Sequence, residues 1–122
     1  KRRVKTEQQK LGQQGEDLAA QYLQAQGYRL IGANYRIRTG EIDLITREKE
    51  TLVFVEVKSR KSQKFGNPLE SIDQIKLQKL IKVALTYVRE YNWSGPFRID
   101  VIGIDWNAPN GPKIQHLKNA LS

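Results

Sequence analysis

The hydrophobic positions along the chain predict two helices. Apolar or small residues recur at helical spacing over residues 11–23, and Gly27 stands where a helix C-cap belongs. A second helical stripe covers residues 77–91, and Ser71, with Gln74 three residues later, predicts a capping box at its start.

Short runs of strand-forming residues fill most of the remaining chain. The first two are separated by a turn at Gly32-Ala33-Asn34, and turns are also expected at residues 94–96 and 107–112. The predicted strands are residues 28–31, 35–37, 42–46, 52–57, 97–104 and 113–117. A mixed β-sheet flanked by the two helices, an α/β fold, would bury both apolar stripes.

The third and fourth of these strands predict a hairpin that carries charged residues inside apolar runs. A two-residue turn would place Asp43 directly opposite Glu56, and a four-residue loop would place it opposite Phe54, one pleat away. Either length puts Asp43 and Glu56 on one face, whereas an odd length would separate them. Lys58 shares the face of Glu56 because side chains alternate along a strand.

Two converging carboxylates in a basic protein form a site for a hard divalent cation, Mg²⁺ or Mn²⁺. A cation at Asp43 and Glu56 could polarise a phosphodiester, and Lys58 could orient water or stabilise the developing charge. An ordinary ion pair on a solvated sheet edge is the alternative for these residues.

The composition of the chain limits the classes of partner and of site that we expect. The 122 residues carry 21 Lys and Arg against 13 Asp and Glu, a net charge of +8, which suits a polyanion such as nucleic acid. The chain has no cysteine, so disulfides and thiolate zinc sites are excluded. No apolar run reaches the ~20 residues that span a bilayer, so we expect a cytoplasmic location without membrane contact. We expect one domain over residues 1–122, with residues 1–7 as a flexible basic arm.

Several basic residues are candidates for phosphate contacts. A basic loop is predicted at residues 59–68, and the start of the second helix attracts phosphate through its backbone N–H groups. The expected nucleic-acid contacts are Arg36, Arg38, Arg60, Lys61, Lys64 and Lys76. Cutting both strands symmetrically needs two sites, so we expect a homodimer through the loop at residues 65–68 or the last strand.

Other polar and aromatic residues have structural explanations. Asp100 interrupts an apolar strand, where pairing with Arg98 accounts for it, and His116 is expected to be structural. We expect Trp93 and Trp106 to pack beside turns, and we consider Glu41 for an outer position around the cation.

The ordered set of motifs resembles the YraN-like family of bacterial proteins, within the restriction-endonuclease-like PD-(D/E)xK nuclease superfamily. The residues that carry this resemblance are Gly15–Ala20 with Tyr22-Leu23, Gly40–Ile45, Val53–Arg60, Phe65-Gly66 and Arg98–Ile102. The family is similar to archaeal Holliday-junction resolvases, and Ile42 stands where the superfamily signature has an optional proline.

The resemblance implies a restriction-endonuclease-like fold in which Asp43 and Glu56 are metal ligands and Lys58 is the catalytic lysine. A helical glutamate that completes the metal shell in such nucleases matches Glu16. That residue lies at the margin of the apolar helix face, whereas Asp17 points to solvent.

The sequence therefore predicts a metal-dependent endonuclease acting on DNA, in particular on branched or structured DNA. The alternative is a nucleic-acid-binding module that keeps the fold without cleaving. A third interpretation, a small structural partner in a larger complex, leaves the acidic residues unexplained.

Overall fold

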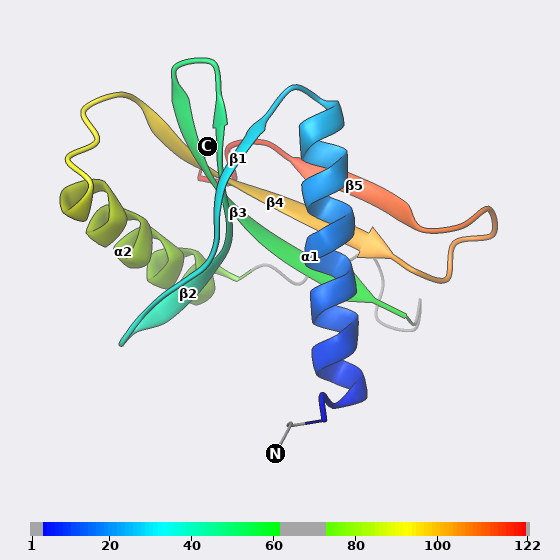
Figure 1. The fold of residues 1–122 in the computed structure, drawn as a ribbon. Helices are drawn as coiled ribbons and strands as arrows, with labels where there is room; N and C mark the ends of the chain where they lie inside the picture. Colours follow the sequence, from blue (N-terminus) through cyan, green and yellow to red (C-terminus); the bar gives the residue numbers. More distant parts are fainter. Residues whose placement is uncertain (1–3, 62–72, 122) are drawn as a thin grey trace.

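The computed structural model describes residues 4–61 and 73–121. Within these ranges the chain forms two helices and five strands (Figure 1). The elements are α1 (Glu7–Ala25), β1 (Arg29–Ile37), β2 (Gly40–Glu48), β3 (Thr51–Arg60), α2 (Gln74–Glu90), β4 (Phe97–Asp105) and β5 (Lys113–Leu117). The expected α/β fold, a mixed sheet flanked by helices, is confirmed.

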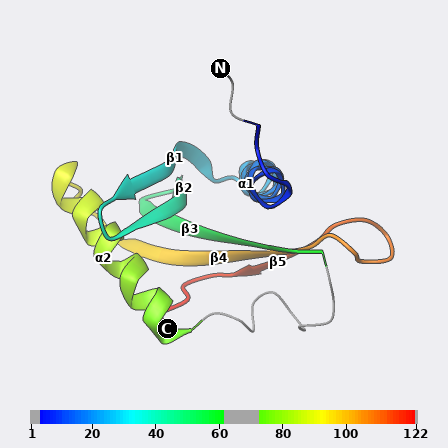
Figure 2. The ribbon, with the colours of Figure 1, turned by 90° about the horizontal axis from the view of Figure 1, so that it is seen from below.

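The strands form one sheet in the order β1-β2-β3-β4-β5. β1, β2 and β3 follow one another as an antiparallel meander, β4 pairs with β3 in parallel, and β5 returns antiparallel to β4. Parallel neighbours need a long crossover, and α2 lies in that connection. Figures 1 and 2 show α1 and α2 well separated, with the sheet between them.

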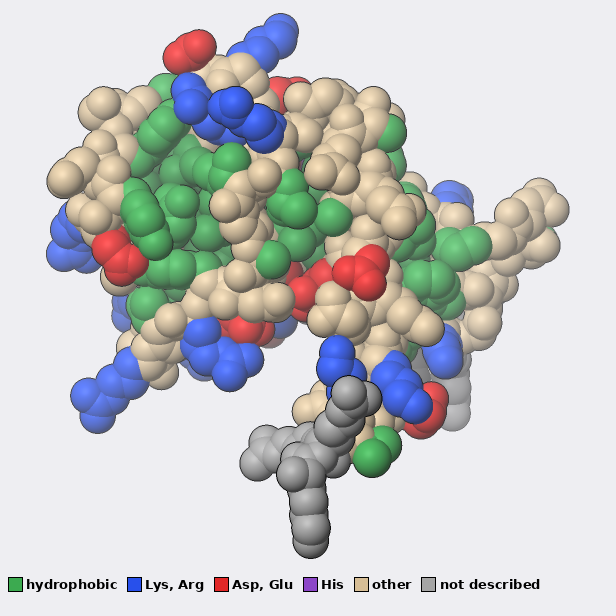
Figure 3. Space-filling model, in the orientation of Figure 1, with side chains coloured by type: hydrophobic (Ala, Val, Ile, Leu, Met, Phe, Trp, Pro, Cys, Tyr) green, Lys and Arg blue, Asp and Glu red, His purple; other side chains and the backbone are tan. Residues whose placement is uncertain are grey.

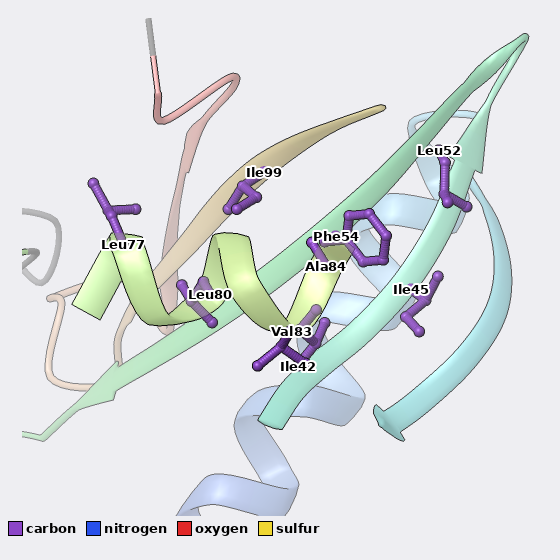
Figure 4. Close-up of a cluster of buried hydrophobic side chains, with 9 residues drawn as sticks. All are labelled: Ile42, Ile45, Leu52, Phe54, Leu77, Leu80, Val83, Ala84 and Ile99. Carbon is purple, nitrogen blue, oxygen red and sulfur yellow. The ribbon is translucent and has the colours of Figure 1, made fainter. Parts of the chain in front are cut away.

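Each face of the sheet has its own hydrophobic cluster. Phe54 on β3 belongs to the cluster beneath α2, whereas Val53 and Val55 belong to the cluster beneath α1, as alternation along a strand requires. Figure 4 shows the α2 cluster, which consists of Ile42, Ile45, Leu52, Phe54, Leu77, Leu80, Val83, Ala84 and Ile99. Neither helix in the described ranges has the length and apolar character that crossing a bilayer demands.

The hairpin of β2 and β3 has the shorter of the two loops considered from the sequence. Glu48 pairs with Thr51, so the turn consists of Lys49 and Glu50, with Lys49 at a φ of 53°. The four-residue loop, the other length considered, is not formed, because residues 47 and 48 still belong to β2.

β2 and β3 separate at the ends away from this turn. Their backbone pairing ends at Leu44 opposite Val55. Beyond it β2 lies against α2, where a Cβ on Gly40 would come 3.1 Å from Cγ2 of Val83. β3 continues beside β4 as far as Arg60, so residues 59 and 60, expected in a basic loop, are part of the strand. Figure 1 shows the two strands diverging, and we call the space between them the fork.

β1 is one strand, whereas two short strands around a turn were expected. It pairs with β2 along its length, with an irregularity of register between Leu30 and Gly32. Asn34, expected in the turn, lies within the strand at a φ of 52°. Asparagine tolerates this left-handed conformation better than most residues, so the turn-forming signal marked a distorted strand instead.

α1 begins earlier than its apolar stripe indicates. Thr6 and Gln9 form a capping box, with the Gln9 N–H donating to the Thr6 hydroxyl at 3.1 Å and the Thr6 N–H donating to Gln9 Oε1 at 2.9 Å. Thr6 and Glu7 therefore belong to the start of the helix and not to a flexible arm. The expected cap at Gly27 is confirmed by its φ of 95°.

α2 is capped by Asp73, whose side chain accepts a hydrogen bond from the N–H of Lys76 at 2.7 Å. Gln74 is the first helical residue and cannot be the third residue of a capping box, so the box expected at Ser71 is wrong. Ser71 itself lies outside the described residues.

Close contact between α1 and β3 depends on a glycine. A Cβ added to Gly15 would collide with Oγ of Ser59 and lie 3.6 Å from Cγ1 of Val57. Gly12, one turn earlier on the same helix, has open space where its Cβ would be.

We expect Gly15→Leu to lower the free energy of unfolding by about 1–3 kcal/mol, because a side chain there must push α1 away from β3. The matched control Gly12→Leu should raise stability by up to about 1 kcal/mol, since leucine favours the helix and meets no neighbour. Urea unfolding of both variants tests this. Equal effects of the two substitutions would show that α1 does not pack on β3 as described.

Candidate active site

The fork brings two carboxylates together. Asp43 and Glu56 follow directly beyond Leu44 and Val55, the last paired residues of the two strands. The Asp43 carboxyl is hydrogen-bonded to Glu56, and its Oδ2 accepts a hydrogen bond from the N–H of Val57 at 2.8 Å. Where the strands separate, this N–H would otherwise have no hydrogen-bond partner. Asp43 therefore ends the backbone hydrogen bonding between β2 and β3 and also takes part in the acidic pair.

The surroundings of this pair disfavour the ionised form of both carboxyl groups at once. Burial raises the pKa of Asp43 to about 8, helped by the charge of Glu56 and their hydrogen bond and opposed by the Val57 N–H. The Glu56 residue is only 6% exposed. Two carboxylates in one poorly solvated place resist being ionised together, and a cation between them would remove that repulsion.

Two lysines lie on the same side of the sheet. The Lys76 ammonium, from the first turn of α2, is 2.6 Å from Oε2 of Glu56. Burial alone would depress the pKa of Lys76, but the hydrogen bond and charge of Glu56 outweigh it and raise the pKa. Burial and the neighbouring Lys76 charge together lower the pKa of Lys58. Lys58 therefore lies close enough to both Lys76 and Glu56 to feel their charges.

Glu16 reaches the fork from α1, on the other face of the sheet. Its Oε1 accepts a hydrogen bond from the side-chain amide of Asn34 at 2.9 Å. Burial raises the pKa of Glu16, the Asn34 bond lowers it, and the charges of Glu41, Asp17 and Glu56 raise it further. As the helical wheel indicated, Glu16 is half-buried whereas Asp17 is exposed.

A cavity of about 320 Å³ joins these residues. It is lined by Glu16, Asp43, Glu56 and Lys76, together with Gln8, Leu11, Gly12, Val57 and Ser59. The buried hydroxyl of Ser59 has no hydrogen-bond partner among the described residues. Carboxylates from both α1 and the sheet thus face one small polar space.

The oxygen donors fit Mg²⁺ or Mn²⁺ in number and kind. Within residues 4–61 and 73–121, no three His, Asp or Glu side chains are gathered as a ready metal-binding group. Asp43 and Glu56 are brought together, whereas Glu16 is held by Asn34 and lines the same cavity. Magnesium is often held by one or two carboxylates and keeps several waters, so this pair provides enough protein ligands.

The basic residues expected to contact nucleic acid are spread around this region. Arg36 forms an ion pair with Glu41 at 3.0 Å, and Arg38 and Lys61 are exposed. Arg60 ends β3, and Lys64 lies outside the described residues, as does the loop at residues 65–68. On the face shown in Figure 3, acidic side chains lie near the middle and Lys and Arg side chains lie along the margin below them.

The sequence did not point to Asn34, which holds Glu16, or to Ser59, which lines the cavity. Asn34 was assigned to a turn, although its ability to adopt a positive φ was the signal that could have marked it. Ser59 carries no signal of its own, because its burial depends on Gly15 approaching from a distant part of the chain.

A second buried charged cluster lies on the α1 face. Asp100, 0% exposed, is 2.9 Å from Nε of Arg98 and 2.8 Å from Nε2 of His116, and it accepts a hydrogen bond from the N–H of Asn119 at 3.0 Å. Burial would raise the pKa of Asp100, but its bonds to His116 and Arg98 outweigh this and lower it. The expected pairing of Asp100 with Arg98 and the structural place of His116 are confirmed.

The two tryptophans pack as expected. Trp93 lies beneath the Arg47 guanidinium, 4.9 Å from its ring centroid, and donates to the carbonyl of Pro96 at 3.0 Å. Trp106 packs against the α1-side cluster.

A family model described as "Uncharacterised protein family UPF0102" matches residues 15–104, about three-quarters of the chain. The chain belongs to the UPF0102 family. This agrees with the YraN-like family expected from the motifs, and the matched segment of this UPF0102 protein contains Glu16, Asp43, Glu56, Lys58 and Lys76.

Curated relatives resemble the UPF0102 protein over nearly all of its length. A UPF0102 protein of Methylococcus capsulatus is 43% identical over 110 residues, covering 90% of this chain and 89% of the relative. One of Leifsonia xyli is 46% identical over 110 residues, covering 88% and 92%, and one of Geobacter sulfurreducens is 42% identical over 112 residues, covering 91% and 88%. The elements that form the fork therefore lie within a region shared by relatives of similar length.

The raised pKa of Asp43 should make the stability of this UPF0102 protein depend on pH. The unfolded chain releases the proton near the ordinary value of 3.8, whereas the folded protein holds it until about pH 8. Between these values the folded state binds the extra proton, so the free energy of unfolding should fall as pH rises, by at most about 1.4 kcal/mol per pH unit, and level off above pH 8.

Asp43→Asn should remove this part of the pH dependence. Urea unfolding in EDTA, from about pH 5 to about pH 9, measures the slope for wild type and variant. Asp17→Asn, an exposed carboxylate on α1, is the matched control and should leave the slope unchanged. Identical slopes for wild type and Asp43→Asn would contradict the buried acidic pair.

Proposed function

We propose that this protein is a metal-dependent endonuclease of the PD-(D/E)xK superfamily that hydrolyses phosphodiester bonds in DNA, including branched or structured DNA. The observation that carries the proposal is the acidic pair of half-buried Asp43 and buried Glu56 at the fork, in a chain with a net charge of +8. Binding alone does not require buried carboxylates, because they repel phosphate. A cation held by Asp43 and Glu56 would explain why a chain with a positive net charge keeps this acidic pair.

In this proposal Asp43 and Glu56 hold Mg²⁺ or Mn²⁺, and the waters that magnesium retains fill its other positions. The cation, when bound, supplies the Lewis acid that polarises the phosphodiester and lowers the pKa of water. To Lys58, two residues after Glu56 on β3, we assign the binding of a phosphate oxygen. Its lowered pKa leaves a larger share of this amine neutral, and so able to accept a proton, than in an exposed lysine.

Lys76 and Glu16 have supporting roles in the same proposal. The Lys76 ammonium neutralises Glu56 until a cation takes its place, and it can then turn to a phosphate. Glu16, fixed by Asn34, can accept hydrogen bonds from water in the cavity. Arg36, Arg38, Arg60, Lys61 and Lys64 supply further phosphate contacts around the site.

A nucleic-acid-binding module that does not cleave is the second candidate. One observation favours it: the Lys76–Glu56 ion pair balances one carboxylate without any metal. The basic residues would then bind the backbone, and the acidic pair would have no catalytic task.

Replacing both Asp43 and Glu56 by Ala separates these candidates. The double variant loses two negative charges where phosphate must approach, so in EDTA it should bind DNA at least as tightly as wild type. With Mg²⁺ its cleavage should fall by more than about a thousandfold, since the cation contributes several kcal/mol to the transition state. Cleavage of linear, flapped and four-way-junction DNA and binding by fluorescence anisotropy, at one fixed salt concentration, are the measurements.

Two further variants act as controls. Asp17→Ala with Glu50→Ala changes the net charge equally at exposed positions and should leave cleavage unchanged. Lys58→Ala should slow cleavage without abolishing cation binding. Wild-type binding without cleavage of any substrate, with Mg²⁺ or Mn²⁺, would select the binding module. Cleavage by the Asp43/Glu56 double variant at the wild-type rate would place the activity elsewhere.

A further inference from the structure

A hollow lined by tyrosines lies on the α2 side of β1. Its volume is about 360 Å³, and Tyr35, Tyr87 and Tyr91 provide its aromatic walls, with Ile31 and Ile45 beside them. The rings of Tyr87 and Tyr91 are 4.4 Å apart at their centroids and inclined by 31°, and Tyr35 meets Tyr87 edge-on at 5.1 Å. Figure 3 shows a broad hydrophobic patch on this side of the molecule.

The side chains around the hollow are more exposed than side chains that only pack in the core. Tyr91, which ends α2, is 59% exposed, and Ile31 is 44% exposed. The hydroxyl of Tyr35 donates to the carboxylate of Glu90 at 3.4 Å, which places a negative charge near the hollow. That carboxylate disfavours a phosphate or an acidic side chain, so a flat uncharged group suits the hollow best.

The hollow is connected to the candidate active site through shared residues. Asn34 and Arg36 line both the hollow and a neighbouring groove of about 780 Å³ between α1 and the β1–β2 hairpin. Gly12 and Glu16 line both this groove and the active-site cavity. The three spaces therefore follow one another around the distorted part of β1, and Arg36 lines the two that lie nearer the tyrosines.

A second copy of the chain would fit this edge of the sheet poorly. β1 lies at the end of the strand order, but its register irregularity at Leu30 and the positive φ of Asn34 distort the edge that a partner strand would need. Exposed Arg29, Arg36 and Arg38 would also face the same charges in a two-fold pairing. The positive rim instead complements a polyanion.

We propose that the tyrosine hollow binds an unpaired base of the nucleic acid whose backbone lies at the candidate active site, and this rests on the proposed function. Aromatic rings stack on any base, whereas a base inside a duplex is covered by its neighbours and enters only after it is unstacked. The substrate is thus a DNA with unpaired nucleotides beside the cut, such as a flap or an open junction. Arg36 binds the phosphate that links the stacked base to the site.

Tyr91→Ala tests this in EDTA, where binding is measured without cleavage. The probes are a duplex with a single-stranded flap carrying 2-aminopurine and a blunt duplex of the same number of nucleotides, at one fixed salt concentration. Wild type should prefer the flap, and Tyr91→Ala should weaken flap binding by about 5-fold to 150-fold, the effect of losing one stacking contact, while duplex binding stays the same. Stacking should quench 2-aminopurine fluorescence with wild type but not with Tyr91→Ala.

Two variants control for packing. Tyr91→Phe keeps the ring and should retain flap preference. Leu85→Ala removes another accessible apolar side chain of α2, 40% exposed, and should have no effect. Equal flap affinity of Tyr91→Ala and wild type, or equal loss with Leu85→Ala, would overturn the proposal. A wild-type dimer that Tyr91→Ala converts to monomer, with DNA affinity unchanged, would assign the hollow to a second copy. If the protein binds the flap as expected but does not cleave DNA, the nuclease activity is rejected and the binding of a base in the hollow is not.

Discussion

The separation of β2 from β3 is the constraint on which the candidate site depends. While the strands are paired, each side chain can reach only one face of the sheet, so residues of α1 and α2 cannot meet. Beyond Leu44 and Val55 the backbone pairing of the two strands ends. Glu16 from α1 and Lys76 from α2 then line one cavity with the Asp43–Glu56 pair. The backbone donor left at the fork is satisfied by the Asp43 carboxylate, which fixes that side chain in place.

The electrostatics of the fork follow from this geometry. Burial and mutual repulsion hold a proton on Asp43 up to about pH 8, and the ammonium of Lys76 balances Glu56. Both are responses to negative charge concentrated in a poorly solvated place, which a divalent cation relieves more fully than a single ammonium does. Shifted pKa values of this kind cluster at functional sites, which supports the proposed function.

The sequence predicted what depends on local periodicity and failed where distant elements decide. The two-residue hairpin turn was one of the two loop lengths that side-chain alternation allowed if Asp43 and Glu56 were to share a face. The continuity of β1 through Asn34 could not be predicted, because pairing with β2 overrides the local turn signal. The hydrogen bond from Asn34 to Glu16, and the contact of Gly15 with Ser59, join residues that no local pattern relates.

The central claim, that Asp43 and Glu56 together form one cation site, is tested most directly by binding of Mn²⁺ alone, followed by electron paramagnetic resonance. The wild-type protein should bind one Mn²⁺, and its affinity for Mn²⁺ should fall strongly in Asp43→Ala and in Glu56→Ala. Asp17→Ala, which removes an exposed carboxylate, should bind as wild type does. If the wild-type protein does not bind Mn²⁺, or if loss of either carboxylate leaves the affinity unchanged, Asp43 and Glu56 do not form one cation site.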